Sequence, residues 1–218
     1  MPKRYDLLVF DWDGTLMDST MAIVRAIQHA FRDVGLDAPS DERAKHVIGL
    51  GLAEAMRHLD ANLSQADHVA VVDAYRHHYL SQHAYIELFG GVADALVRYR
   101  EQGFLLAVAT GKSRQGLNRA METVGVTHLF DVTRCADETF SKPHPAMLEQ
   151  IMDVTGMQPS RTLMIGDTSH DLLLARNARA DGFAVSYGAH PLDELEAHQP
   201  VGIAHTFAEL DAWLMQNA

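Results

Sequence analysis

Short apolar runs alternate with amphipathic stretches along most of this chain. Each run is bounded by glycine, aspartate or threonine, which is typical of the buried strands of a parallel sheet. The runs that predict strands are residues 5–10, 104–109, 129–132, 162–165 and 183–185. The stretches that predict helices are residues 92–101, 114–124, 146–154, 172–178 and 207–215. This order of elements predicts a Rossmann-like α/β fold, in which helices sandwich a parallel sheet.

Glycines mark several of the predicted boundaries. Gly103, Gly125 and Gly182 each follow a helical pattern and precede or approach a strand. Glycine is common directly after a helix because it adopts the left-handed backbone conformation without strain. We therefore expect these three glycines to end the helices that precede them.

The segment from about residue 16 to residue 88 breaks the alternation, because it contains no convincing strand. Apolar side chains recur there at helical spacing in three stretches, and Gly90-Gly91 marks a flexible return to the sheet. An insertion directly after the first strand would lie over the carboxyl end of the sheet. We therefore predict a core of residues 1–15 and 89–218 and a helical cap domain of residues 16–88. A packed helical bundle without a catalytic part is the alternative.

Composition narrows the classes of partner. The 218 residues carry a formal net charge of −11, which argues against a nucleic acid partner but not against a small anionic substrate. The single cysteine, Cys135, excludes an intramolecular disulfide and a cysteine zinc cluster. The apolar run near the amino terminus is too short for a signal peptide, and no stretch is long enough to span a membrane. We expect a cytoplasmic protein.

Thirteen histidines raise the question of a zinc site. His77, His78 and His83 lie close together in a polar stretch, but no aspartate or glutamate stands at zincin spacing and His-Glu-x-x-His is absent. We expect most of these histidines to be solvated surface residues.

Two carboxylates follow the first predicted strand. The apolar residues 7–10 lead directly into Asp11-Trp12-Asp13-Gly14-Thr15. Chemistry in α/β proteins is placed at the carboxyl ends of parallel strands. Two carboxylates this close repel each other unless a cation or a shared proton compensates them, and one could act as nucleophile while the other acts as acid and base.

Three further segments bring polar residues to the same edge. Thr110-Gly111 follows one strand, Gly166-Asp167 with Asp171 follows another, and Lys142-Pro143 precedes a helix. Each is weak taken singly, because a Thr-Gly is usually a turn, a Lys-Pro is usually at the surface and an aspartate after a strand is usually a helix cap. Their joint occurrence in this order favours one catalytic site.

The residue types fit phosphate chemistry. Asp11, Asp13 and Asp167 would converge as hard oxygen ligands for Mg²⁺. Thr110 and the backbone N–H of Gly111, at a helix N-terminus, could hold phosphate oxygens. Lys142 would neutralise charge as it shifts in the transition state.

The remaining carboxylate of this set has a supporting role. Asp171 would orient Lys142 or a metal-bound water. The expected reaction is therefore the Mg²⁺-dependent hydrolysis of a phosphate ester.

Two nucleotide motifs are imitated but absent. Gly111-Lys112-Ser113 matches the end of a P-loop, but Leu106 stands where that motif requires glycine. Gly49-Leu50-Gly51 lies inside the helical insert, which makes it a poor dinucleotide site.

Together the four segments resemble the motifs of the haloacid dehalogenase superfamily. The residues that carry the resemblance are Asp11-Trp12-Asp13-Gly14-Thr15, Thr110, Lys142, and Gly166-Asp167 with Asp171, within a match from about Leu8 to Gly188. The insert is similar to the helical cap of subclass C1. Lys142-Pro143-His144-Pro145 and residues 90–112 are most similar to the phosphoglycolate-phosphatase-like branch.

The resemblance implies a mechanism. Asp11 would attack phosphorus and form an aspartyl-phosphate, and Asp13 would protonate the leaving alcohol and then deprotonate the hydrolytic water. Mg²⁺ would be held by Asp11, the backbone carbonyl of Asp13 and Asp167. Dehalogenases and phosphonatases of the superfamily lack the second aspartate of the first motif, so the presence of Asp13 argues against both activities.

Two other functions stay open. A phosphomutase uses the same motifs, and Lys45, His46 and Arg57 could contact a sugar phosphate, although they could equally be surface charges. A non-catalytic phosphate-sensing protein is the second alternative, which the presence of every motif residue disfavours. The expected partner is a small phosphorylated metabolite, with phosphoglycolate as the first guess. Exposed apolar cap surface could support a homodimer.

Overall fold

The computed structural model describes residues 3–82 and 86–218, and its centre is a parallel six-stranded sheet in the order β3-β2-β1-β4-β5-β6. The first strand is central, because it pairs with β2 on one side and β4 on the other. The strands are β1 (Leu7–Phe10), β2 (Leu105–Thr110), β3 (Val132–Cys135), β4 (Thr162–Gly166), β5 (Asp181–Val185) and β6 (Ile203–Ala204). The predicted parallel α/β sheet is confirmed.

Helices cover both faces of the sheet. Successive side chains of a strand point to opposite faces, so an apolar strand needs helices packed on each face to bury them. Leu8 and Phe10 of β1 belong to an apolar cluster with α5 (Val92–Glu101), α6 (Arg114–Thr123) and α10 (Phe207–Asn217). Leu7 and Val9 belong to a second cluster with α7 (Ala146–Thr155) and α8 (Ser169–Asn177). A strand buried on both faces needs the uninterrupted apolar run that the sequence shows.

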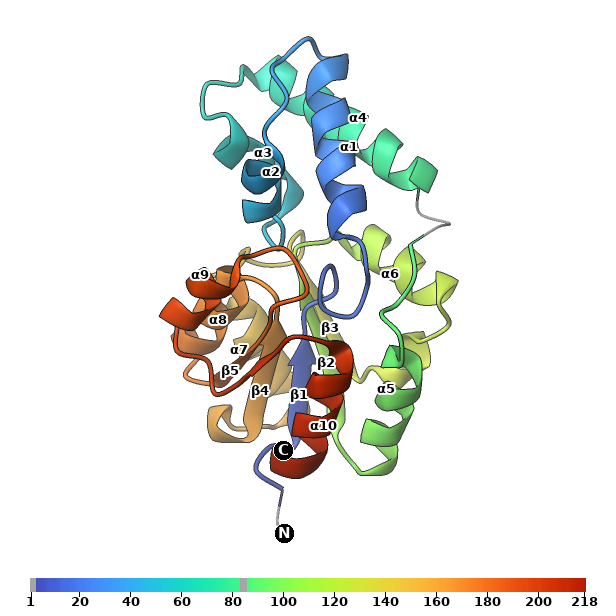
Figure 1. Ribbon diagram of the computed structural model, residues 1–218, viewed down its shortest axis with the longest axis vertical. Helices are drawn as coiled ribbons and strands as arrows, with labels where there is room; N and C mark the ends of the chain where they lie inside the picture. The colour runs from blue at the N-terminus through green and yellow to red at the C-terminus, as the bar shows by residue number, and fades with distance from the viewer. Residues whose placement is uncertain (1–2, 83–85) are drawn as a thin grey trace.

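The predicted insert is helical where the structure describes it. It contains α1 (Thr20–Asp33), α2 (Asp41–His46), α3 (Leu52–Leu59) and α4 (Gln65–Gln82). Figure 1 shows these four helices grouped beyond the end of the sheet toward which β1 points. The two chain segments that connect the insert to the sheet lie side by side, because Met17 in the first forms an isolated antiparallel β-bridge with Leu88 in the second. Met17 also forms a parallel bridge with Asp13 in the first segment. The division into a core and a cap domain stays a prediction.

Several boundaries differ from those expected. Residues 127–129 form a 3₁₀ turn and β3 begins only at Val132, because this partly exposed strand carries polar Thr133 and Arg134 and shows no apolar run. The short strand β6 and helix α9 (Leu192–Ala197) have too few residues for a clear pattern. Of the three helical stretches expected in the insert, the one at residues 47–59 is helical only from Leu52 onward, because a turn at residues 47–51 precedes α3.

The glycine predictions have a mixed outcome. Gly103 and Gly125 have φ values of +80° and +73°, as expected of residues that end a helix. Gly182 was wrongly assigned, because it lies within β5 and packs against Leu172 and Ala175 of α8. The residue with positive φ after α8 is Arg179. Within the described ranges, no helix is long and apolar enough to cross a membrane.

Candidate active site

Three strands deliver polar side chains to one edge of the sheet. Asp11 follows β1, Thr110 is the last residue of β2, and Asp167 follows β4. Because β2 and β4 flank β1 in parallel register, these residues meet at the carboxyl edge. All three are almost completely buried. The topology of the sheet therefore brings together motifs that lie up to about 150 residues apart in the chain.

A buried lysine connects two of the aspartates. Lys142 Nζ lies 2.9 Å from Asp11 Oδ1 and donates a 2.6 Å hydrogen bond to Asp171 Oδ1. The other oxygen of Asp171 accepts hydrogen bonds from the backbone N–H and the hydroxyl of Thr168. These contacts fix Asp171 within the first turn of α8. Its carboxylate in turn holds Lys142 against Asp11, and the two neighbouring negative charges raise the pKa of the Lys142 ammonium against the opposing effect of burial.

Asp167 is held from two sides. Its oxygens accept hydrogen bonds from the Thr15 hydroxyl and from the backbone N–H of Ala189, both at 2.8 Å. Gly14 and Gly188 lie against it, and a Cβ at either glycine would come within 2.3 Å of Asp167 Oδ2. The chain can approach this carboxylate so closely only where a side chain is absent. Gly14 was quoted in the first motif, whereas Gly188 has no local signal as a contact of Asp167.

The three carboxylates Asp11, Asp167 and Asp171 form a candidate metal centre. One oxygen from each lies within 4.8 Å of the other two. Burial raises the pKa of Asp11 to about 7, because Lys142 only partly offsets the desolvation of its charge. Burial and the neighbouring charges of Asp11 and Asp171 hold the pKa of Asp167 well above its usual range. Neither Asp11 oxygen accepts a well-directed hydrogen bond within the described ranges. A divalent cation would satisfy these oxygens, and hard oxygen ligands suit one.

Asp13 points away from that centre and into the space below the cap helices. Its carboxylate accepts a 2.7 Å hydrogen bond from the Ser19 hydroxyl and two 2.9 Å hydrogen bonds from Lys112 Nζ. These partners orient the Asp13 side chain toward the insert, and it is not one of the three carboxylates that form the cluster, so its expected place in a metal centre stays a prediction. A ligand role for its backbone carbonyl stays a prediction.

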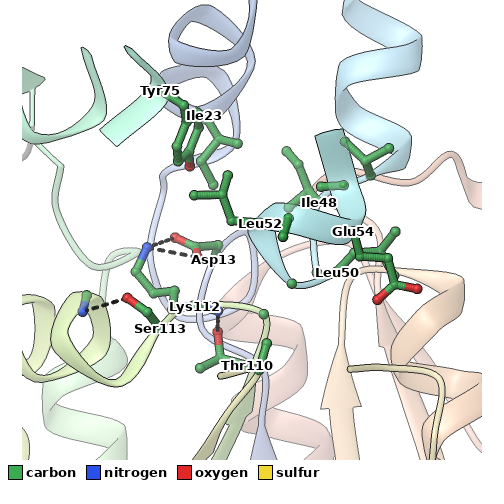
Figure 2. Close-up of a pocket in the computed structure, with 18 of the residues that line it drawn as sticks. Asp13, Ile23, Ile48, Leu50, Leu52, Glu54, Tyr75, Thr110, Lys112 and Ser113 are labelled. Carbon is green, nitrogen blue, oxygen red and sulfur yellow. Dashed lines mark hydrogen bonds and ion pairs between the residues drawn. The ribbon is translucent and has the colours of Figure 1, made fainter. Parts of the chain in front are cut away.

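Lys112 and Tyr79 are the residues that sequence reasoning missed. Lys112 Nζ donates a 2.9 Å hydrogen bond to the Tyr79 hydroxyl. It also donates hydrogen bonds to Asp13, which Figure 2 shows as dashed lines. Desolvation and the negative charge of Asp13 raise the pKa of the Tyr79 phenol to about 12, so the hydroxyl stays neutral. Lys112 appeared only in the rejected P-loop match. The position of Lys112 two residues after Thr110 was the one indication that it lies near the carboxyl edge of the sheet. Tyr79 lies within an apolar helical stretch of the insert, which by itself indicates only packing.

Substituting Lys112 tests whether it acts through Asp13. We expect Lys112→Met to lower kcat by about 10- to 100-fold, because Asp13 loses the contact that positions it and small misplacements are costly. The same substitution in an Asp13→Ala background should add little further loss, and steady-state kinetics of the four proteins measure this coupling. Fully additive losses would show that Lys112 has a separate role.

Thr110 and Gly111 differ in one respect from expectation. Gly111 does not begin a helix, because the Ser113 hydroxyl accepts a hydrogen bond from Gly116 N–H and α6 therefore starts at Arg114. Thr110 Oγ1 accepts a 3.2 Å hydrogen bond from Lys112 N–H, which folds the loop back on itself. A phosphate-binding role for Thr110 and Gly111 stays a prediction.

The helical insert meets the loops at the edge of the sheet through a glycine-containing turn, residues 47–51. A Cβ on Gly111 would lie 2.4 Å from Leu50 O and 2.6 Å from Gly49 O. Gly51 N–H also donates a 2.9 Å hydrogen bond to Ser141 Oγ. The Gly49-Leu50-Gly51 segment, judged a poor dinucleotide site, is thus the part of the insert that rests on the motif loops.

A methyl group at Gly111 should interfere with this contact. We expect Gly111→Ala to reduce kcat/KM by about 10- to 100-fold, because the turn must move away from the catalytic edge. The melting temperature should change little if the insert shifts as a unit. Gly116→Ala is the matched control, because its Cβ would come no closer than 3.3 Å to Ser113 Oγ. Equal activity of both variants would contradict the proposed importance of the contact.

A cavity of about 540 Å³ lies between the insert and the edge of the sheet. Asp11, Asp13 and Thr110 line its floor. The turn 47–51, helices α1, α3, α4 and α6, and residues 111–113, 136, 137 and 141 contribute to the rest, and Figure 2 shows part of this lining. Asp11 and Asp13 therefore face the space that a small molecule would enter under the insert.

Histidines gather elsewhere than expected. His46 at the end of α2 stacks on His190 with ring centroids 4.9 Å apart, and His190 Nδ1 lies 3.0 Å from Glu194 Oε1. His170 and His190 both approach the carbonyl of His46, at 3.0 and 3.2 Å. These contacts join the insert to the core, so His46 packs against the core rather than lining the cavity. The stretch with His77 and His78 is on α4, and His83 lies outside the described residues.

The other two candidate cap contacts differ from each other. Arg57 lines the cavity as an exposed residue, whereas Lys45 is not among its lining residues.

Comparison with known proteins gives a consistent family. The sequence model of haloacid dehalogenase-like hydrolases matches residues 8–185. A probable phosphatase IndB of Dickeya dadantii is 35% identical over 94% of this chain and 91% of its own length. A phosphoglycolate phosphatase of Aliivibrio fischeri is 32% identical over 95% and 96%. The crystal structure of a predicted phosphoglycolate phosphatase from Haemophilus somnus shares the fold, with a TM-score of 0.85, 24% identity and coverage of 96% and 98%.

Proposed function

The chain belongs to the haloacid dehalogenase-like hydrolase family, and we propose that this phosphatase hydrolyses small phosphomonoesters through an aspartyl-phosphate on Asp11. The observation that carries the proposal is the buried Asp11 carboxylate, which faces the cavity and accepts no well-directed hydrogen bond within the described ranges. A nucleophile needs such an unengaged oxygen directed at the space where substrate binds.

The reaction divides between two aspartates. An oxygen of Asp11 attacks phosphorus, the bond from phosphorus to the ester oxygen breaks, and Asp13 donates a proton to the departing alkoxide. Asp13 then accepts a proton from a water molecule, whose oxygen attacks the phosphorus of the aspartyl-phosphate and releases Asp11 and inorganic phosphate. Lys142 stabilises the negative charge that develops on the phosphoryl oxygens.

We propose Mg²⁺ as the divalent cation. Asp11 and Asp167 with the backbone carbonyl of Asp13 would hold it, because both oxygens of Asp171 are engaged by Lys142 and Thr168. When bound, the cation neutralises the phosphoryl oxygens and Asp11. The division into a core (residues 1–15 and 89–218) and a cap (residues 16–88), a cytoplasmic location and a homodimer contact on the cap belong to the same proposal.

Phosphate release with and without metal tests the function. We expect release from phosphoglycolate and other small esters in Mg²⁺, and loss of at least about 99% of it in excess chelator, because the buried carboxylates then face substrate uncompensated. Restoring Mg²⁺ should restore the rate, which controls for unfolding. Product analysis separates the alternatives: inorganic phosphate supports a phosphatase, whereas an isomeric phosphate ester would indicate a mutase. Absence of both products would favour a binding protein.

A further inference from the structure

The cavity above Asp11 and Asp13 is lined mainly by apolar side chains on the side of the insert, where Glu54, Arg57 and Arg76 are the charged residues of the described lining. Ile23 and Ile27 of α1, Ile48 and Leu50 of the turn, and Leu52 and Met56 of α3 all contribute to its wall. Figure 2 shows Ile23, Leu52, Ile48 and Leu50 around the space above Asp13. Two helices and the turn between them and the sheet thus present apolar side chains to the region that the leaving group of an ester would occupy.

Tyr75 extends this apolar wall. It lines the cavity on α4 and stacks on Tyr79 with ring centroids 5.7 Å apart and planes 14° from parallel. Aromatic faces favour contact with other rings and with hydrocarbon. The wall therefore includes a flat surface suited to a ring.

The cations near the catalytic edge are already engaged. Lys142 is completely buried between Asp11 and Asp171. An ammonium has three N–H donors, and those of Lys112 have three acceptors within 2.9 Å in Asp13 Oδ1, Asp13 Oδ2 and the Tyr79 hydroxyl. A second carboxylate next to the ester oxygen, such as that of glycolate, would face Asp13 without a cation of its own.

The remaining cations that line the cavity lie toward solvent. Arg57, Arg76 and Arg119 are exposed, and Arg76 pairs with Asp73 at 3.1 Å. Beyond Lys142 and Lys112, positive charge is therefore offered at the outer rim of the cavity rather than beside the leaving group of the ester.

The size of the cavity agrees with its chemistry. A cavity of about 150 Å³ is enough to bind benzene in a protein interior. The present cavity of about 540 Å³ leaves room for a ring in addition to a phosphoryl group. Glycolate would leave most of the apolar wall uncovered.

We infer that the preferred substrate of this site is a phosphomonoester whose alcohol carries a bulky, uncharged, apolar or ring-bearing group, in preference to a phosphorylated hydroxy acid. This inference rests on the proposed phosphatase function and specifies its substrate class. Burial of such a group against Leu52, Ile48 and Tyr75 supplies binding that a small anion cannot obtain.

The test compares three esters of primary alcohols in Mg²⁺: 2-phenylethyl phosphate, ethyl phosphate and phosphoglycolate. The two alkyl esters have similar leaving-group reactivity, so their ratio of kcat/KM reports recognition. We expect 2-phenylethyl phosphate to exceed ethyl phosphate by at least about tenfold, and phosphoglycolate to be the poorest of the three. Direct binding of the same esters to Asp11→Asn, measured by calorimetry, should show the same order without turnover.

A positive charge introduced into the apolar wall of the cavity should weaken the preference for 2-phenylethyl phosphate over phosphoglycolate. Leu52 is the first residue of α3 and is half-buried, so Leu52→Arg is expected to fold. It should lower the ratio of 2-phenylethyl phosphate to phosphoglycolate by at least about tenfold, because it adds a cation and removes hydrocarbon. Met21→Arg is the matched control, since Met21 is exposed on α1 outside the cavity lining and should leave the ratio unchanged.

The outcomes of these experiments test the inferred substrate class separately from the proposed phosphatase function. Phosphate release that is fastest from phosphoglycolate, or a ratio unaffected by Leu52→Arg, would overturn the inferred substrate class and leave the phosphatase function standing. No release from any of the three esters would overturn both. A preference for 2-phenylethyl phosphate that Leu52→Arg weakens would support both.

Discussion

Asp11→Asn is expected to abolish turnover, with kcat lowered by at least about 10⁴-fold on every phosphomonoester. An amide is a poor nucleophile and also a weaker ligand for a divalent cation than a carboxylate. The fold should persist, because asparagine has nearly the same shape and the substitution removes a desolvated charge close to Asp167 and Asp171. Phosphate release measures the loss, and thermal unfolding without metal should show no decrease in melting temperature.

Asp18→Asn is the matched control for this substitution. Asp18 is an exposed residue of the same connection between β1 and α1. Its substitution should leave kcat within about twofold, as is usual for surface changes. More than about 1% of the original rate in Asp11→Asn would rule out Asp11 as the nucleophile.

Asp13→Ala should cost about 10²- to 10⁴-fold in kcat while metal binding is partly kept. The substitution removes the group proposed to protonate the leaving alkoxide, but leaves Asp11 and Asp167 in place. Its effect should therefore depend on the ester. p-Nitrophenyl phosphate, whose anion departs without a proton, should lose less in the aspartyl-phosphate step than an alkyl phosphate. Rapid-mixing measurements of p-nitrophenolate and phosphate isolate that step.

Ser19→Ala distinguishes the proton-transfer role of Asp13 from the positioning of its carboxylate. Ser19 donates a hydrogen bond to Asp13 and so orients it, but cannot itself transfer the proton. A loss smaller than that of Asp13→Ala is expected. An equal loss on alkyl and p-nitrophenyl esters in the first step of Asp13→Ala would contradict the acid role, and full wild-type turnover would remove Asp13 from the mechanism.

Strongly apolar elements could be predicted from the sequence. The apolar run at β1 predicted a buried strand, and the strand shows that run because both of its faces pack against helices. The bounds of α5 matched because it begins after Gly91 and ends before Gly103. Motif order then placed Asp11, Thr110 and Asp167 at one edge, since parallel strands end together. Edge elements were poorly predicted because β3 and β6, at the two ends of the strand order, are short and lack an uninterrupted buried apolar run.

Contacts between the insert and the core could not be predicted in this way. The orientation of Asp13 depends on Ser19, Lys112 and Tyr79, which lie 6, 99 and 66 residues away in the chain. The pattern of neighbouring residues does not indicate contacts between residues that lie this far apart in the chain. The gathering of His46, His170 and His190 likewise depends on how the insert rests on the core.

The contact of the turn 47–51 with Gly111 has a consequence for how this protein can change. The atoms that meet there are the backbone oxygens of Gly49 and Leu50 and the bare Cα of Gly111, so the fit does not depend on which side chains the neighbouring cap helices carry. Mutations at Leu52 or Met56 could then alter selectivity while the insert continues to seat on the same loops. Substrate preference can therefore change during evolution while the catalytic residues are retained. Residues 47–51 of the turn are where we expect substitutions to be tolerated least.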